Sequence, residues 1–145
     1  MGISDILNLF RQGQGSARSH MKNLIEMAAV DGNFDDAEHD LLKKIARRNN
    51  ISESRLKDIY RNPGEVQFVV PRDKQERFHQ LYELVMMMSA DNSVHDEEMK
   101  LCNLYAVKFG YPRESSSEII QSIQSNIKNA QPLQETFKRL EWMLN

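Results

Sequence analysis

The chain has 145 residues, 40% of them hydrophobic and 28% charged, with a formal net charge of −2. This composition excludes a disordered polymer and argues against a dedicated nucleic-acid binder, which typically carries a basic excess. No apolar run reaches the roughly 20 residues of a membrane span, and the N-terminus lacks the features of a secretory signal. The single cysteine, Cys102, excludes an intramolecular disulfide. We therefore expect a cytoplasmic protein with one domain that buries a core.

The first residues are expected to form a separate short element, which can dock on the domain, on a partner or on nothing. Ser4 can cap a short helix over residues 4–11, whose apolar side chains fall on one side. The glycine-rich residues 12–16 are typical of a flexible link. We therefore predict a short helix and link over residues 1–15 and a helical domain over residues 16–145.

Helical periodicity dominates the rest of the chain, because apolar residues recur three and four positions apart. The apolar residues that mark the predicted helices are, in chain order, Met21, Leu24, Ile25 and Ala28; Leu41, Leu42, Ile45 and Ala46; Leu56, Ile59 and Tyr60; Phe78, Leu81, Leu84, Val85 and Met88; Leu101, Cys102, Tyr105 and Phe109; Ile119, Ile120, Ile123 and Ile127; Leu133, Phe137, Leu140 and Leu144. About seven helices with short connections predict a compact all-α bundle.

Local signals place some of the boundaries. Val66–Val70 has the composition of a strand but no second strand to pair with, so we interpret it as a buried connector. Pro71 is expected to start the next helix, and Pro132 the last one. Ser115 with Glu118 resembles a capping box, which predicts a helix start at that point.

An internal repeat appears when the chain is shifted by 60 residues, so that residues 24–52 lie over residues 84–112. Seven of these 29 positions are identical, where about two are expected from average residue usage. The identical pairs are Leu24/Leu84, Met27/Met87, Asp31/Asp91, Asp36/Asp96, Glu38/Glu98, Leu41/Leu101 and Ala46/Ala106. Shared apolar periodicity does not explain three carboxylates in register. We therefore predict two pseudo-symmetric helix–acidic turn–helix repeats.

Each repeat has the same predicted local structure. A helix ends near an aspartate, Asp31 or Asp91, and Gly32 in the first copy favours the positive φ of a helix stop. Phe34 and Val94 are then expected to place one apolar side chain each into the core. A second helix follows, with a glutamate in its first turn.

The acidic turns are candidate metal ligands. They do not form EF-hands, because the glycine that this loop requires is replaced by Asp36 in the first copy. If the two turns approach each other, Asp31, Glu38, Asp91 and Glu98 can offer four carboxylates to Ca²⁺, Mg²⁺ or Mn²⁺. A carboxylate at a helix C-terminus opposes the macrodipole, so a neighbouring cation would compensate it. The alternative is that the same residues only cap helices and make turn hydrogen bonds.

The two motifs resemble the repeat of the TerB-like (tellurite-resistance) family. They read Val30–Gly32 with Glu38, and Ala90–Asn92 with Glu98, the second with asparagine in place of glycine. The resemblance covers roughly residues 16–145. It implies a helical protein of tellurite or general stress resistance, with divalent-metal binding proposed for the acidic residues.

Other conspicuous residues carry weaker signals. The four histidines, His20, His39, His79 and His95, are dispersed and do not have zinc-ligand spacing. Lys43–Lys44 and Arg47–Arg48 are interpreted as a solvated helix face, and Met86–Met88 as core packing. Cys102 is expected in the core, and Trp142 as an anchor in the core or at an interface.

We therefore expect a non-enzymatic helical module that acts through protein partners, and the family resemblance implies that it belongs to a tellurite-resistance or general stress-response system. One interpretation adds a divalent cation at the acidic turns. The alternative is a metal-free protein–protein interaction or scaffold domain. No nucleophile–base motif or phosphate-binding loop is present, so a metal-dependent hydrolase is the third choice.

Overall fold

The computed structural model describes residues 2–30, 32, 34–90 and 94–143, with the backbone alone for residues 4–14. Over this part the chain forms seven α-helices and two short 3₁₀ helices and contains no β-strand, as the all-α prediction requires. The elements are α1 (Ile3–Ala29), α2 (Asp36–Arg48), α3 (Glu53–Arg61), η1 (Pro63–Glu65), α4 (Lys74–Met88), α5 (Asp96–Lys108), α6 (Arg113–Lys128), α7 (Leu133–Leu140) and η2 (Glu141–Met143). None of the helices described is long and apolar enough to cross a bilayer.

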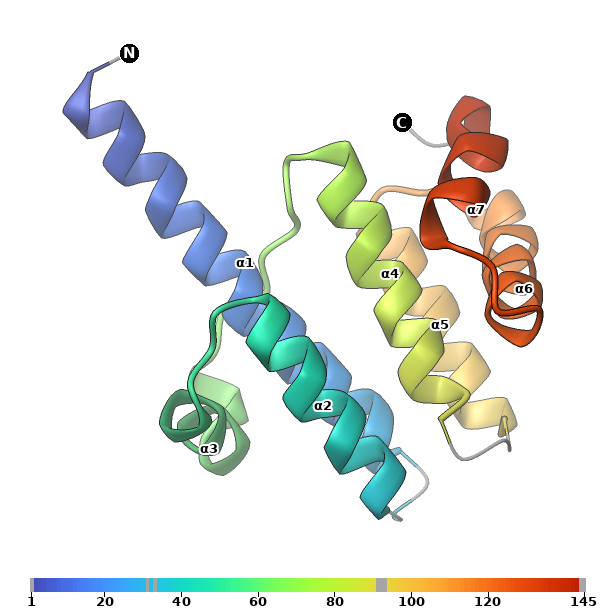
Figure 1. Ribbon diagram of the computed structural model, residues 1–145, viewed down its shortest axis with the longest axis horizontal. Coiled ribbons are helices and arrows are strands. Elements are labelled where there is room, and N and C mark those ends of the chain that lie inside the picture. Colours follow the sequence, from blue (N-terminus) through green and yellow to red (C-terminus); the bar gives the residue numbers. More distant parts are fainter. Residues whose placement is uncertain (1, 31, 33, 91–93, 144–145) are drawn as a thin grey trace.

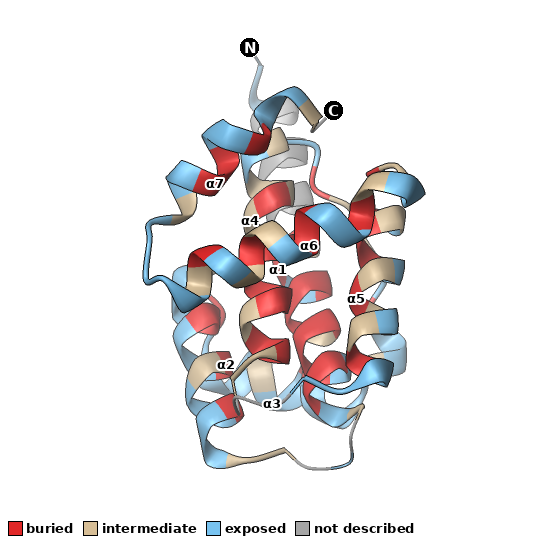
Figure 2. Ribbon diagram, turned by 90° about the vertical axis from the view of Figure 1, so that its right-hand side faces the viewer, coloured by how far each residue is buried: buried red, intermediate tan, exposed pale blue. Residues whose placement is uncertain are grey.

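Helix α4 lies at the centre of the bundle. It contacts α1 and α2 on one side and α5, α6 and α7 on the other, an arrangement visible in Figure 1. Consistent with this position, α4 is buried around most of its circumference, whereas α5 and α6 in Figure 2 alternate buried and exposed faces. A helix that is apolar on several faces needs neighbours on several faces, and α4 has them.

Helix α1 differs from the prediction at its start. The sequence predicted a short helix and a flexible link over residues 1–15, but the backbone is helical without a break from Ile3 to Ala29. Gly13 and Gly15 each cost a helix about 1 kcal/mol, yet no proline stops it and neither glycine takes a positive φ. The first half of α1 projects beyond the bundle, as Figure 1 shows.

Residues 66–70 form an irregular connector, as predicted, but of these five residues only Val66 is buried, while Gln67 is exposed and residues 68–70 are half-buried. Val66 is buried, and its carbonyl accepts a hydrogen bond from Lys22 Nζ at 3.2 Å. The backbone N–H of Val69 donates to Ser19 Oγ at 2.9 Å, which fixes the connector along α1. Helix α4 then begins at Lys74, not at the predicted Pro71, because the Asp73 side chain accepts the N–H of Glu76 and so caps the helix.

The predicted capping box of Ser115 and Glu118 is wrong. Helix α6 begins at Arg113 with Pro112 at the N-cap, so both residues lie inside the helix. The preceding helix explains the earlier start. Gly110, with a φ of 96°, ends α5 and returns the chain directly into α6. Proline at this point needs no hydrogen-bond partner for a backbone N–H, which suits a helix start.

We call helices α1–α3 and helices α4–α6 the two halves of the bundle, with α7 following the second half. Local features of the two halves match at the predicted shift of 60 residues. Helices α2 and α5 both have 13 residues and begin at Asp36 and Asp96, while α3 and α6 begin at Glu53 and Arg113. The buried residues of α2 and α5 occupy equivalent positions, namely Glu38, Leu42, Ile45 and Ala46 against Glu98, Cys102, Tyr105 and Ala106. The match thus extends beyond the aligned segments into a third helix.

The ends of α2 and α5 match as well. Asn50 has a φ of 58° where the second half has Gly110, and both helices finish with the same reversal. The N–H of Ile51 donates to the carbonyl of Ala46 at 2.9 Å, and that of Tyr111 to Ala106 at 3.1 Å. This is the six-to-one bond of a Schellman motif. The pseudo-twofold relation between the halves stays a prediction.

Candidate functional site

The two predicted glutamates occupy equivalent places. Glu38 is 2% exposed and Glu98 is 3% exposed, each in the first turn of its helix. Glu38 Oε1 accepts the backbone N–H of Asp35 at 3.3 Å, and Asp35 Oδ1 accepts the N–H of Glu38 at 2.9 Å. In the second copy, Glu98 Oε1 accepts the N–H of His95 at 3.2 Å. Each glutamate therefore accepts the N-cap amide of its helix, as in a capping box.

The starts of α2 and α5 lie at the same end of the bundle, the lower end of Figure 1. The positive end of each helix dipole faces its buried carboxylate, which stabilises the negative charge there. The helices that precede the turns end at Ala29 and Met88, and Gly32 has the predicted positive φ of 77°. Buried carboxylates of both copies are thus presented at one end of the molecule.

The other two predicted ligands, Asp31 and Asp91, lie outside the described residues. Within the described part of the chain, no three His, Cys, Asp or Glu side chains form a group that could hold a metal ion. The four-carboxylate site therefore stays a prediction that rests on the sequence for its aspartates and on the buried positions of Glu38 and Glu98.

The apolar residues of the two turns differ. Phe34 packs partly against the core, and its ring centroid lies 4.0 Å from that of His39. Val94 is 42% exposed, so the prediction that it enters the core is wrong.

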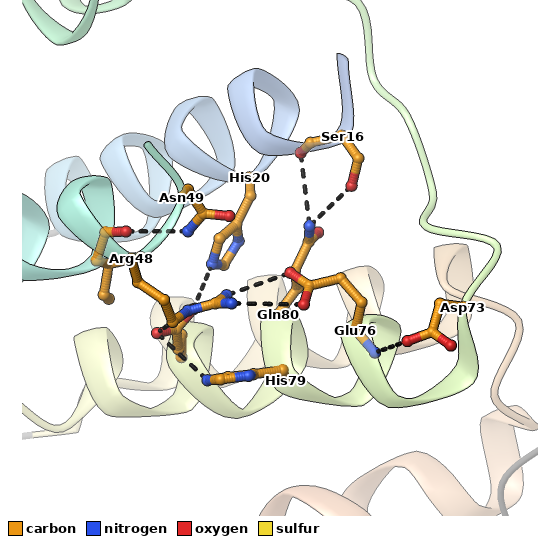
Figure 3. A network of polar contacts seen from close by, with 10 residues as sticks. Ser16, His20, Arg48, Asn49, Asp73, Glu76, His79 and Gln80 are labelled. Atoms are coloured by element: carbon orange, nitrogen blue, oxygen red, sulfur yellow. Dashed lines mark hydrogen bonds and ion pairs between the residues drawn. The ribbon is translucent and has the colours of Figure 1, made fainter. Parts of the chain in front are cut away.

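A second polar site lies between α1, α2 and α4, and sequence reasoning missed it. We call it the Glu83 cluster; it contains His20, Arg48, Glu76, His79 and Glu83, and Figure 3 shows it from close by. Glu83 is only 5% exposed and His20 is fully buried. A buried carboxylate requires partners, since an unpaired one is costly.

Glu83 receives hydrogen bonds from two other helices. His20 Nε2 lies 2.9 Å from Glu83 Oε1. Arg48 Nη2 donates to Oε1 at 2.6 Å and Arg48 Nε to Oε2 at 3.0 Å, the two-pronged geometry that makes arginine–carboxylate pairs strong. One carboxylate thus connects α4 to both α1 and α2.

The outer part of the Glu83 cluster is half-exposed. Arg48 also bonds Glu76, with Nη2 at 3.2 Å from Oε1 and Nη1 at 3.4 Å from Oε2. His79 Nε2 lies 3.6 Å from Glu83 Oε2, one helical turn away on α4. The sequence predicts a solvated helix face for Arg48, but its guanidinium pairs with Glu76 and Glu83 of α4.

The partners shift the pKa values of this cluster. Burial alone would raise the pKa of the Glu83 carboxyl, but the hydrogen bonds from His20 and Arg48 lower it below its usual range. Burial is the largest influence on His79 and lowers its pKa, with Arg48 and His20 acting in the same direction and Glu83 opposing. Although burial opposes it, the same two carboxylates raise the pKa of Arg48. Glu83 and Arg48 are therefore an ionised pair at neutral pH.

One signal could have revealed this cluster. Glu83 lies within the apolar run from Leu81 to Met88, and His20 adjoins the buried stripe that starts at Met21. A charged residue at a core position of a helix requires a partner from another helix. The periodicity indicates the position, but it does not say which residue supplies the partner.

Cys102 and Trp142 lie in opposite environments. Cys102 is fully buried, and burial raises its pKa to about 12, so it is a core thiol and not a reactive one. Trp142 is 81% exposed, which excludes the core position and leaves the interface role as a prediction.

No family model, curated protein or solved structure matched the chain. The resemblance to the TerB-like family therefore rests on the two acidic-turn motifs alone and stays a prediction.

Proposed function

We propose that the chain is a non-enzymatic helical module of a stress-response system, of the tellurite-resistance kind, that acts through protein partners and binds one divalent cation at its acidic turns. The observation that carries the proposal is the pair of buried glutamates, Glu38 and Glu98, at equivalent positions and at one end of the bundle. Ca²⁺, Mg²⁺ and Mn²⁺ are the expected cations, because they prefer carboxylate oxygens.

The turns can serve this role because each glutamate is already oriented. Its Oε1 is held by the N-cap amide, so the carboxylate is fixed without a cation. Fixed ligands lose little conformational entropy on binding, which favours affinity. Asp31 and Asp91, in the turns just before, are the proposed remaining ligands.

A metal-free scaffold domain is the alternative, and one observation favours it. The capping hydrogen bonds give Glu38 and Glu98 a structural role that needs no metal. In this case the acidic turns only shape the end of the bundle, and partners bind elsewhere.

Calorimetric titration of chelator-treated protein with Ca²⁺, Mg²⁺ and Mn²⁺ tests the proposal. The decisive variant is the double change Glu38→Gln and Glu98→Gln, because glutamine keeps the acceptor that the capping box uses and removes the charge. We expect saturable binding by the original chain and none by the folded double variant. The double variant Asp31→Asn and Asp91→Asn should behave alike.

The matched control is Glu97→Gln, whose side chain is 72% exposed on the same first turn of α5. It should bind the cation as the original chain does. Absence of binding at about 1 mM of each cation, a concentration that reaches even weak extracellular-type sites, would reject the metal and favour the scaffold.

A further inference from the structure

The first half of α1 shares a regular sequence pattern with the half that lies in the bundle. Positions separated alternately by four and three residues run from Ile3 to Ala28, which is the a and d spacing of a coiled coil. These positions are Ile3, Leu7, Phe10, Gln14, Ala17, Met21, Leu24 and Ala28. We call this line of positions the α1 seam, and residues 3–13 of the same helix the arm.

The two parts of the seam have different surroundings. Within the bundle, where α1 contacts α2, α3 and α4, the seam positions from Ala17 to Ala28 are at most 7% exposed. The arm projects beyond the bundle, as Figure 1 shows, and Ile3 at its start is 78% exposed. A helix of about a dozen residues is marginal in water by itself, and Gly13 weakens this one further. The arm thus carries the first part of a seam whose second part is covered by neighbouring helices.

We propose that the arm is a dimerisation element, which pairs with the arm of a second copy of this chain in an antiparallel coiled coil. The seam positions of the arm are uncharged, so two identical seams can meet without repulsion. A two-fold axis then makes the contact self-complementary, as in most homodimers. The arm and the starts of α2 and α5 lie at opposite ends of Figure 1, so this inference is independent of the cation site.

The bundle determines the direction of the pairing. Helix α1 is unbroken from Ile3 to Ala29. A copy that lay parallel to it on the seam would therefore continue into the space of the helices that cover Ala17 to Ala28. An antiparallel copy ends at that point, and its own bundle lies beyond the other end of the paired arms. Neither bundle then displaces a helix of the other.

One register pairs the seam over the full length of the arm. In an antiparallel coiled coil each a position is level with a d position of the partner helix. Leu7 is then level with Phe10 of the second copy, and Ile3 with Gln14. A shift by one heptad either leaves half of this seam unpaired or carries the arm into the bundle. Such a pair buries on the order of 1,000 Å², the low end for specific interfaces, so we expect a weak dimer that depends on concentration.

Analytical ultracentrifugation of the full chain in chelator, from about 5 µM to about 500 µM, tests the proposal. We expect a monomer at the lowest concentration and a dimer at the highest. Leu7→Asp places a carboxylate in the seam and should raise the dissociation constant at least about 100-fold. The matched control is Asn8→Asp, which adds the same charge one position outside the seam and should dimerise as the original chain does. A monomer at every concentration, or a dimer that Leu7→Asp leaves intact, would overturn the proposal.

Two further measurements make the result decisive. At about 5 µM, the Tm of Leu7→Asp should stay within about 2 °C of the original, because the arm lies outside the bundle. If that variant does not fold, Ile3→Asp repeats the test at the exposed end of the seam. Small-angle X-ray scattering of the dimer gives the direction of pairing. Two bundles separated by the paired arms support the antiparallel arrangement, whereas two bundles side by side overturn it.

Discussion

Helices α2 and α5 share the same backbone motifs at both ends, but their last side chains make different contacts. Both start with a buried glutamate that caps the helix, and both end in a Schellman reversal. Their last residues, Arg48 and Lys108, are equivalent by the shift of 60. Arg48 pairs with Glu83 across the bundle. Lys108 Nζ instead lies 5.2 Å from the ring centroid of Phe68 and 5.9 Å from that of Tyr105.

This difference separates what local sequence determines from what tertiary contacts determine. Caps and reversals involve residues within six positions of one another, so similar sequences produce similar helices. The role of the terminal cation depends on the helix that faces it. Arg48 meets the buried carboxylate of Glu83 on α4, whereas Lys108 meets the aromatic rings of Phe68 and Tyr105, where its charge is stabilised more weakly.

The largest expected effect comes from the buried carboxylate. Glu83→Gln should lower the free energy of unfolding by about 3 kcal/mol at neutral pH, because the hydrogen bonds from Arg48 and His20 lose their negatively charged acceptor. Arg48 is 29% exposed and can turn toward water, so the loss should fall at the lower end of values for buried pairs. Urea unfolding followed by circular dichroism measures it.

Glu97→Gln is the control for this loss, since it removes an exposed carboxylate of α5 that pairs with Lys100, at 3.5 Å. Its expected cost is below about 0.5 kcal/mol. Equal costs for the two glutamates would mean that the Glu83 cluster contributes no more than a surface pair.

Substitution of either capping glutamate should lower the free energy of unfolding by the same amount. Glu38→Ala and Glu98→Ala, each measured in chelator, should each lower the free energy of unfolding by about 1 kcal/mol, because each leaves an N-cap amide without its acceptor. Urea unfolding again gives the values. A cost confined to one of the two would show that the shared sequence motif does not perform the same task in both halves.

Much of the fold could be predicted from the sequence because its signals are local. Pro132 precedes α7 as predicted, and Ser52 caps α3 with its Oγ accepting the N–H of Arg55. Two errors concern helix boundaries. The glycine-rich residues 12–16 are helical, because no proline interrupts α1 there. Helix α6 begins at Arg113, with Pro112 and not Ser115 at its N-cap, because Gly110 ends α5 just before it.

The candidate sites divide in the same way. Glu38 and Glu98 could be predicted because acidic residues at equivalent positions of two helix starts can be recognised from the sequence alone. The Glu83 cluster could not, since His20 and Glu83 are 63 positions apart and Arg48 and Glu83 are 35 apart. Helical periodicity predicts which positions are buried, but it contains no information on which buried polar groups meet.

The smallest expected effect concerns the cation of α5. Lys108→Met keeps an unbranched apolar stem over Phe68 and Tyr105 and removes only the charge, so the cost should be that of an exposed cation–π contact, about 0.5 kcal/mol. The equivalent change Arg48→Met should cost several times more, because it leaves Glu83 as a buried carboxylate without its principal donor. Measuring both by urea unfolding compares two equivalent positions under one substitution. If the two costs are equal, the buried pair of Arg48 and Glu83 contributes no more to the free energy of unfolding than the contact of Lys108 with the two rings.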